Sequence, residues 1–185
     1  SSAEGYGMSL ELVAEHLDGE LTGMETYRVY LDLAAASDVV TSFSGSDEFA
    51  LELNTTTSFY QHPLGAATPA MLSDMALDAV PALAYDSYIT LGLDGPAGAG
   101  EQDASFIPAI PGGPVGTWPE EFEAGNNLVI NSALGSGWYV TPDAANGVAG
   151  DDQRILIAQL TTDGDLSGQF RTQIFPEGDQ ENDVR

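Results

Sequence analysis

Apolar and polar residues alternate along much of the chain, beginning with the segment from Tyr6 to Ala14, in which every second side chain is apolar. Further strand candidates are the segments 27–33, 48–53, 85–93, 127–130, 137–140, 155–162 and 166–175, most of which alternate in the same way. Short alternating runs separated by Gly, Pro, Asn and Asp are typical of antiparallel sheets. The pattern therefore predicts an all-β fold, an antiparallel sandwich or barrel.

The segment 155–175 shows two strand patterns on either side of an acidic turn. Residues 166–175 alternate, whereas the run ILIAQL is apolar on nearly both faces. Asp163-Gly164 between the two runs predicts a hairpin with a type I′ turn. With a two-residue loop, the hairpin leaves three apolar residues to be covered by something else, namely Leu156, Ala158 and Leu160. A three-residue loop would exchange the two faces, leaving Ile155 and Ile157 uncovered.

One short helix is expected to interrupt the strands. In ATPAMLSDMALDAVP, Thr68 is a candidate N-cap, Pro69 suits the first helical position and Pro81 ends the run. This helix should cover an open edge or end of the sandwich with an apolar stripe formed by Met71, Leu72, Met75 and Ala79. Residues 94–119 are rich in Gly and Pro and predict a long surface loop with a short strand near 105–107.

The length of 185 residues suits one domain. We expect an N-terminal strand or arm at residues 1–14, a single sandwich domain at 15–178 and a polar tail at 179–185. The chain opens with SSAEGYG and contains no cysteine. This opening fits a mature product whose leader has been removed, so we expect a secreted, extracellular protein.

The charge of the chain limits its partners. Twenty-nine acidic residues face four arginines, lysine does not occur, and the net charge is −25. Four arginines cannot form a basic patch, which argues against any nucleic-acid partner. The chain has no run of about 18 apolar residues, so no membrane span is expected.

Catalytic signatures are scarce, and we expect no enzyme. His16 and His62 lie in unrelated turn-like segments, and neither belongs to a nucleophile-elbow pattern such as G-x-S-x-G. No cofactor is required by the sequence, but two loops rich in oxygen ligands keep calcium open as an alternative. Its candidate ligands are Asp151, Asp152, Asp163 and Asp165. Neither loop has EF-hand spacing, and a hairpin turn explains the second pair better than a metal does.

Aromatic residues suggest an alternative function. Trp118 lies in the Gly/Pro-rich loop, where exposure is expected, and could offer a flat stacking face to a polysaccharide. The other aromatic candidates lie in strand patterns and are expected in the core.

The N-terminal strand has two interpretations. It can be the first strand of its own sandwich, which is the simpler interpretation. Alternatively, it can leave its domain and add to the sheet of a neighbour, with backbone hydrogen bonds for affinity and alternate side chains in pockets. A contact of that kind is head-to-tail and propagates into a filament.

Several phrases together resemble a family of secreted bacterial β-sandwich proteins of jelly-roll type. They are METYRVYLDL (24–33), NTTTSFYQHPLGAATP (54–69), PALAYDSYITLGLDGP (81–96), NGVAGDDQRILIAQLTTDGDLSG (146–168) and QIFPEGD (173–179). The resemblance covers about residues 8–178. It implies a jelly-roll sandwich and, from some relatives, subunits of extracellular helical fibrils in which an N-terminal strand inserts into the next subunit. It implies no catalytic activity.

We therefore expect a structural subunit of an extracellular bacterial filament, with other copies of itself as partners. The expected donor residues are Tyr6, Met8, Leu10 and Leu12. The expected acceptor groove is formed by Leu156, Ala158 and Leu160. The alternative is a carbohydrate-binding or adhesive sandwich that acts as a monomer.

Overall fold

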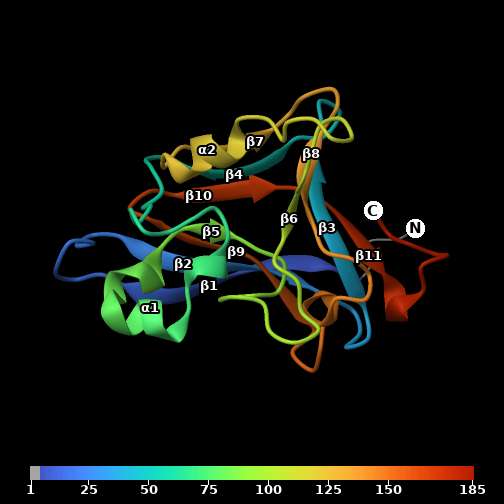
Figure 1. Ribbon diagram of the computed structural model, residues 1–185, viewed down its shortest axis with the longest axis horizontal. Helices are drawn as coiled ribbons and strands as arrows, with labels where there is room; N and C mark the ends of the chain where they lie inside the picture. Colours follow the sequence, from blue (N-terminus) through green and yellow to red (C-terminus); the bar gives the residue numbers. More distant parts are fainter. Residues whose placement is uncertain (1–4) are drawn as a thin grey trace.

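The structure, a computed structural model, describes residues 5–185 and consists mainly of antiparallel strands (Figure 1). The strands are β1 (Gly7–Glu15), β2 (Glu25–Asp32), β3 (Val39–Gly45), β4 (Leu51–Thr55), β5 (Tyr88–Ile89), β6 (Ser105–Ile107), β7 (Leu128–Ile130), β8 (Ser136–Tyr139), β9 (Arg154–Thr162), β10 (Leu166–Gln169) and β11 (Arg171–Phe175). The helices are α1 (Asp74–Ala79) and α2 (Trp118–Glu123), with 3₁₀ turns η1 (Pro69–Met71), η2 (Pro81–Tyr85), η3 (Ala145–Gly147) and η4 (Pro176–Gly178). The expectation of an all-β antiparallel sandwich is confirmed.

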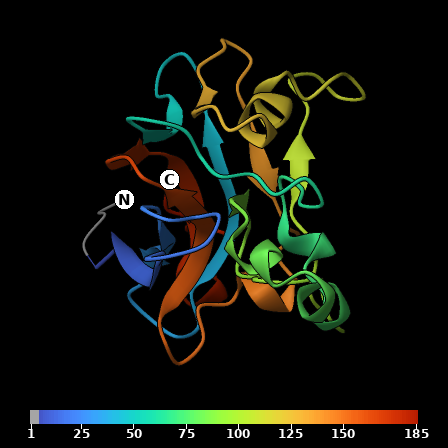
Figure 2. The same cartoon turned by 90° about the vertical axis from the view of Figure 1, so that its left-hand side faces the viewer.

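The strands form three sheets around one main core. Their orders are β1-β2-β9-β5, β10-β4-β7 and β11-β3-β8-β6. Figure 1 shows the first two as facing layers, with the third crossing them at one end, where β10 continues into β11. Figure 2 shows β1 and the helical segment around α1 on opposite sides of the molecule.

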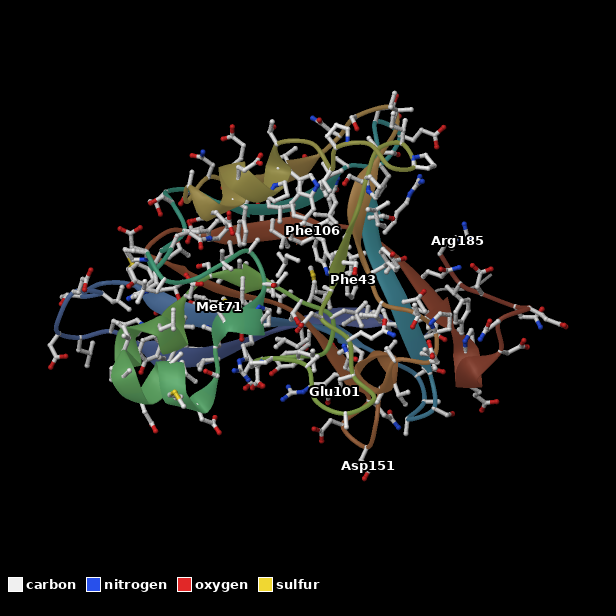
Figure 3. The ribbon with its side chains drawn as sticks, in the orientation of Figure 1. Phe43, Met71, Glu101, Phe106, Asp151 and Arg185 are labelled. Atoms are coloured by element: carbon white, nitrogen blue, oxygen red, sulfur yellow. The ribbon has the colours of Figure 1, made fainter. Side chains whose placement is uncertain are left out.

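Large side chains from all three sheets fill the space between the layers. Phe43, Trp138 and Ile157 are fully buried, and the tilted rings of Phe43 and Trp138 have centroids 5.6 Å apart. Figure 3 shows Phe43 and Phe106 between the layers. Burial of such side chains contributes about 1.5–3 kcal/mol each.

The predicted hairpin between residues 155–162 and 166–175 is wrong. Strand β9 pairs with β2 on one side and β5 on the other, whereas β10 pairs with β4 and β11 with β3. The turn at Asp163-Gly164 therefore crosses from one layer to another. Gly164 has no positive φ, so the turn is not of type I′. The physical reason is that a strand with two apolar faces is suited to a central position, where it is covered from both sides.

The helical segment covers the outer face of β9. Leu156 packs there with Leu72, Leu83 and Tyr88. The expected single helix is divided into η1, α1 and η2, and Ser73 rather than Thr68 caps α1 by accepting a hydrogen bond from the Ala76 N–H. Of the expected apolar stripe, only Leu72 is buried.

Two members of the expected stripe, Met71 and Met75, are exposed, at 58% and 82%. The division at Ser73 changes the face that the helix turns to the sheet, so Ala76 and Leu77 pack there in their place. A second helix, α2, was not expected from the sequence.

The short strand expected near 105–107 is β6, so that prediction is confirmed.

The tail at 179–185 is attached to the domain, because Ile174 and Val184 exchange two backbone hydrogen bonds of 2.9 and 2.8 Å. Among residues 5–185 no helix has the length and apolar character needed to cross a membrane.

Candidate assembly edge and polar pocket

The N-terminal strand lies at the edge of its own sheet. Strand β1 pairs antiparallel with β2 from Gly7 opposite Asp32 to Glu15 opposite Glu25, with one irregularity at Val13. Two side-chain contacts support this pairing: Ser9 Oγ donates to Asp32 Oδ1 over 2.9 Å, and Arg154 forms an ion pair with Glu11 over 2.8 Å. The first four residues of the expected arm lie outside the described residues.

The apolar side of β1 is only half covered. Met8 and Leu10 are each 51% exposed, and Leu12 is 46% exposed, whereas Tyr6 is partly buried against the core. Met8 and Leu10 lie opposite Leu31 and Val29, which are buried in the core. Directly opposed residues of paired strands point to the same face. The exposed side chains of β1 therefore lie on the inner face of the sheet, where the second layer does not reach them.

An open apolar groove separates β1 from β10, the edge strand of the facing sheet. Two adjoining cavities of about 120 and 340 Å³ follow this groove. The first is lined mainly by Met8, Leu10, Val29, Leu53, Leu160 and Leu166, and the second adds Tyr6, Leu31, Phe49 and Phe170. Within residues 5–185, β1 pairs only with β2 and β10 only with β4, so both strands present an unpaired backbone edge.

The expected acceptor residues do not form an uncovered face. Leu156, Ala158 and Leu160 are 6%, 0% and 2% exposed, and their own chain covers them. A bulge shifts the pairing between Val29–Ala158 and Tyr30–Leu156, so Leu156 points to the helical segment while the other two point into the main core.

The groove combines residues that sequence reasoning did not bring together. Of the three expected acceptor residues, only Leu160 lines it. Val29, Leu53 and Leu166 come from strands far apart in the chain. Their alternating patterns indicate inward-facing side chains, but they do not show which strands are neighbours.

Trp118 is not exposed, so its expected role as a stacking platform for polysaccharide is wrong. It begins α2, is 6% exposed, and its Nε1 donates to Ser136 Oγ over 2.9 Å. Its ring meets Phe106 and Trp138, with centroids 4.9 and 6.0 Å apart. The ring is therefore used in packing and is not open to a ligand, because α2 turns the side chain toward the core.

The candidate calcium ligands lie in two turns at opposite ends of β9. Asp151 and Asp152 precede the strand and Asp163 and Asp165 follow it, so the length of β9, about 30 Å, separates the two pairs. Asp163 accepts a hydrogen bond from Thr57 Oγ1 over 2.6 Å. Within residues 5–185 no three acidic or histidine side chains are grouped as metal ligands would be.

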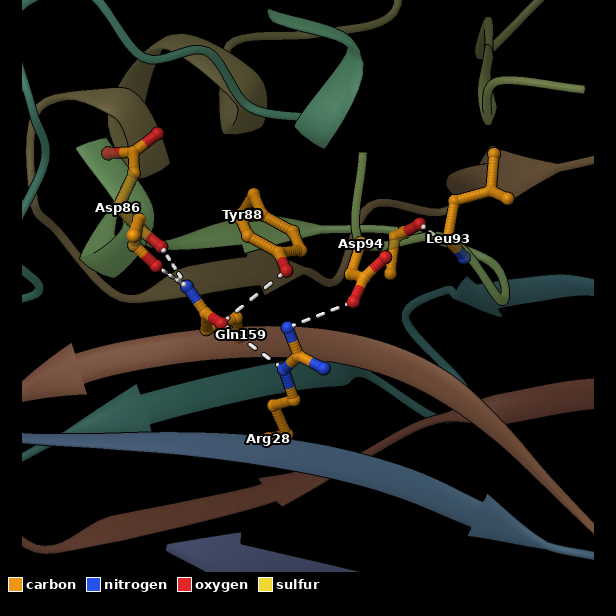
Figure 4. Close-up of polar contacts among 8 residues, drawn as sticks. Arg28, Asp86, Tyr88, Leu93, Asp94 and Gln159 are labelled. Carbon is orange, nitrogen blue, oxygen red and sulfur yellow. Dashed lines mark hydrogen bonds and ion pairs between the residues drawn. The ribbon is translucent and has the colours of Figure 1, made fainter. Parts of the chain in front are cut away.

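A polar pocket of about 570 Å³ lies on the outer face of the sheet, beside α1. Figure 4 shows its central contacts. Arg28 forms an ion pair with Asp94 over 3.2 Å, and its Nε donates to Gln159 Oε1 over 3.3 Å. Gln159 Oε1 also accepts from the Tyr88 hydroxyl over 3.5 Å. Sequence reasoning missed this pocket, because its residues come from three separated segments.

A buried carboxylate lies beside the pocket. Asp86 is 1% exposed and its Oδ1 accepts a hydrogen bond from the His62 N–H over 2.7 Å. Burial raises the pKa of Asp86 to about 6, although backbone hydrogen bonds oppose this effect. Gly65 lies against the carboxylate, where any side chain would collide with it. Asp86 thus holds the loop at residues 60–67.

We expect Asp86→Asn to change how stability depends on pH. Because the folded pKa lies above the unfolded value of about 3.9, the native state binds more protons between pH 4 and 6. The wild-type protein should therefore lose stability from this group as pH rises, by about 3 kcal/mol in total. Urea unfolding of both proteins at pH 4 and pH 7 measures this. From pH 4 to pH 7, the free energy of unfolding of the wild-type protein should fall by about 2 kcal/mol relative to that of the variant. An identical difference at the two pH values would contradict it.

No protein-family model, curated protein or solved structure matches this chain. The resemblance to secreted bacterial sandwich proteins therefore stays a prediction.

Proposed function

We propose that this chain is a structural subunit of an extracellular bacterial filament, and that it assembles when the N-terminal strand of one protomer inserts into the sheet of the next. One observation carries the proposal. The edge strand β1 holds three large apolar side chains, Met8, Leu10 and Leu12, about half exposed beside an apolar groove.

Exchange of β1 between protomers loses few contacts, because the contacts that it breaks within one chain form again between two chains. A neighbour's β1 would make the same backbone pairs with β2 and the same contacts of Ser9 and Glu11. The exchanged strand alone leaves the groove as open as before, so the gain comes from other surfaces of the neighbouring protomer that pack over the groove. Completing the burial of three half-exposed side chains would contribute about 2–4 kcal/mol per contact.

The geometry of donation decides the form of the assembly. Each protomer would give its strand to one neighbour and receive a strand from another, which is a heterologous contact that extends without closing. The net charge of −25 would repel finished filaments from each other at low salt. Dissolved ions screen such charges over about 10 Å, so a saline environment suits the assembly.

A disulfide lock between β1 and β2 tests the exchange. The chain has no cysteine, Gly7 lies opposite Asp32, and a Cβ on Gly7 would point toward the Asp32 side chain. In the double variant Gly7→Cys/Asp32→Cys, oxidation of the monomer should hold β1 in place and prevent filaments in negative-stain microscopy. The reduced variant should form them. Oxidation after assembly should then give a ladder of disulfide-linked chains on a non-reducing gel.

The single variant Gly7→Cys is the matched control and should form filaments in both redox states. Filaments from the locked monomer would contradict strand exchange. Absence of filaments from the unmodified protein at high concentration and moderate salt would contradict the filament itself.

A further inference from the structure

The polar pocket is separate from the assembly edge. It lies over β2, β9 and β5 on the outer face of the sheet, whereas the groove lies on the inner face beside β1. Its floor is formed by Arg28, Tyr88 and Gln159, and Leu72 and Leu77 from the helical segment line it as well. Its volume of about 570 Å³ falls within the range of about 300–1,000 Å³ found for small-ligand sites.

The side-chain amide of Gln159 fixes the floor of this pocket, because both its nitrogen and its oxygen form hydrogen bonds. Gln159 is 2% exposed, and its Nε2 donates to the carbonyl oxygens of Ala84 and Asp86 over 2.9 and 3.0 Å. These two bonds direct Oε1 to Arg28 and Tyr88 (Figure 4). The guanidinium is therefore oriented before any ligand arrives, and a site whose groups are already ordered loses less entropy on binding.

The pocket offers hydrogen-bond donors and acceptors next to each other. Arg28 supplies guanidinium N–H groups, and Asp94 and Asp74 supply carboxylate oxygens. The Asp94 side chain is 63% exposed, so it has room for a partner besides Arg28. A pair of neighbouring hydroxyl groups fits this arrangement, because a hydroxyl can donate to a carboxylate and accept from a guanidinium.

The charges of the pocket narrow the ligand class. One arginine faces two aspartates, and the whole chain carries −25, so an anionic ligand would be repelled. Leu72, Leu77 and Pro96 provide apolar surface for the C–H groups of a ring.

We propose that this pocket binds a neutral sugar unit, with hydroxyl groups held between Arg28 and Asp94. The site differs from the aromatic platform that the sequence suggested at Trp118, and it works without aromatic stacking. It does not depend on filament formation, since none of these residues lies in β1 or β10, the strands beside the groove.

Ligand-observed NMR and calorimetry on the full chain test this site. The probes are glucose, galactose and mannose, with galacturonate as an anionic counterpart. At least one neutral hexose should bind saturably at millimolar concentration, and more tightly than galacturonate. Asp94→Asn keeps the shape of an exposed side chain and should weaken that binding about tenfold, because the charged acceptor of the hydroxyl hydrogen bond becomes a neutral amide. Asp165→Asn, at an exposed turn elsewhere, is the matched control and should leave binding unchanged.

Three results would overturn the assignment. The first is the failure of all three hexoses to bind saturably. The second is hexose binding that Asp94→Asn leaves intact, which would place the site elsewhere. The third is tighter binding of galacturonate than of any hexose, which would exclude a neutral ligand.

Discussion

Removal of residues 1–15 should abolish filament formation completely and leave a domain that is restored by the missing strand as a separate peptide. The deletion exposes the backbone edge of β2 and the inner side chains Val29 and Leu31, which β1 now flanks. Loss of a whole strand with its backbone hydrogen bonds lowers stability far more than a surface substitution does. Addition of the peptide should restore the pairing, because it offers the same alternation of side chains.

Thermal unfolding and microscopy of the truncated protein, with and without peptide, measure this result. The peptide should raise the melting temperature in a concentration-dependent way, as expected for a ligand of the native state. A peptide with Met8→Asp and Leu10→Asp is the matched control and should give little stabilisation, because it places two charges on the inner face. Filaments from the truncated protein without peptide would refute donation by β1.

Substitution of Trp118 by alanine should cost about 3–5 kcal/mol in the free energy of unfolding. The side chain is 6% exposed and packs against Phe106 and Trp138, so its removal leaves a cavity that the rigid sheets cannot fill. The indole hydrogen bond to Ser136 is lost as well.

Urea denaturation of the monomeric protein gives this value. Tyr139→Ala supplies the comparison, because Tyr139 lies next to Trp138 on β8 but is 40% exposed, and its loss should cost less than about 1 kcal/mol. A change below about 1 kcal/mol for the Trp118 variant would mean that the tryptophan does not belong to the core.

Most of the strands could be predicted from the sequence, because a strand with one buried face has an apolar residue at every second position. The identity of neighbours could not. The turn at Asp163-Gly164 favours a local hairpin, yet β9 pairs with β2, whose residues lie about 130 positions earlier. Two apolar faces in ILIAQL correctly indicated that something must cover both. Only the fold shows that the helical segment covers Leu156.

The candidate sites show the same limit in different ways. The apolar face of β1 is visible in the sequence as a clean period of two. Trp118 was misplaced, because surrounding glycines and prolines suggested exposure while tertiary packing turned the side chain inward. The pocket of Arg28, Asp94 and Gln159 leaves no local signal, since a polar residue within a strand has the same pattern whether it faces water or a ligand.

The positions of the arginines also affect how readily trypsin-like proteases cleave the folded protein. Trypsin cleaves after Arg or Lys, and the chain has four arginines and no lysine. Arg28, Arg154 and Arg171 lie within β2, β9 and β11. Backbone held in a sheet must open before a protease can bind it. At these three arginines, cleavage by trypsin-like enzymes should therefore follow local or global unfolding.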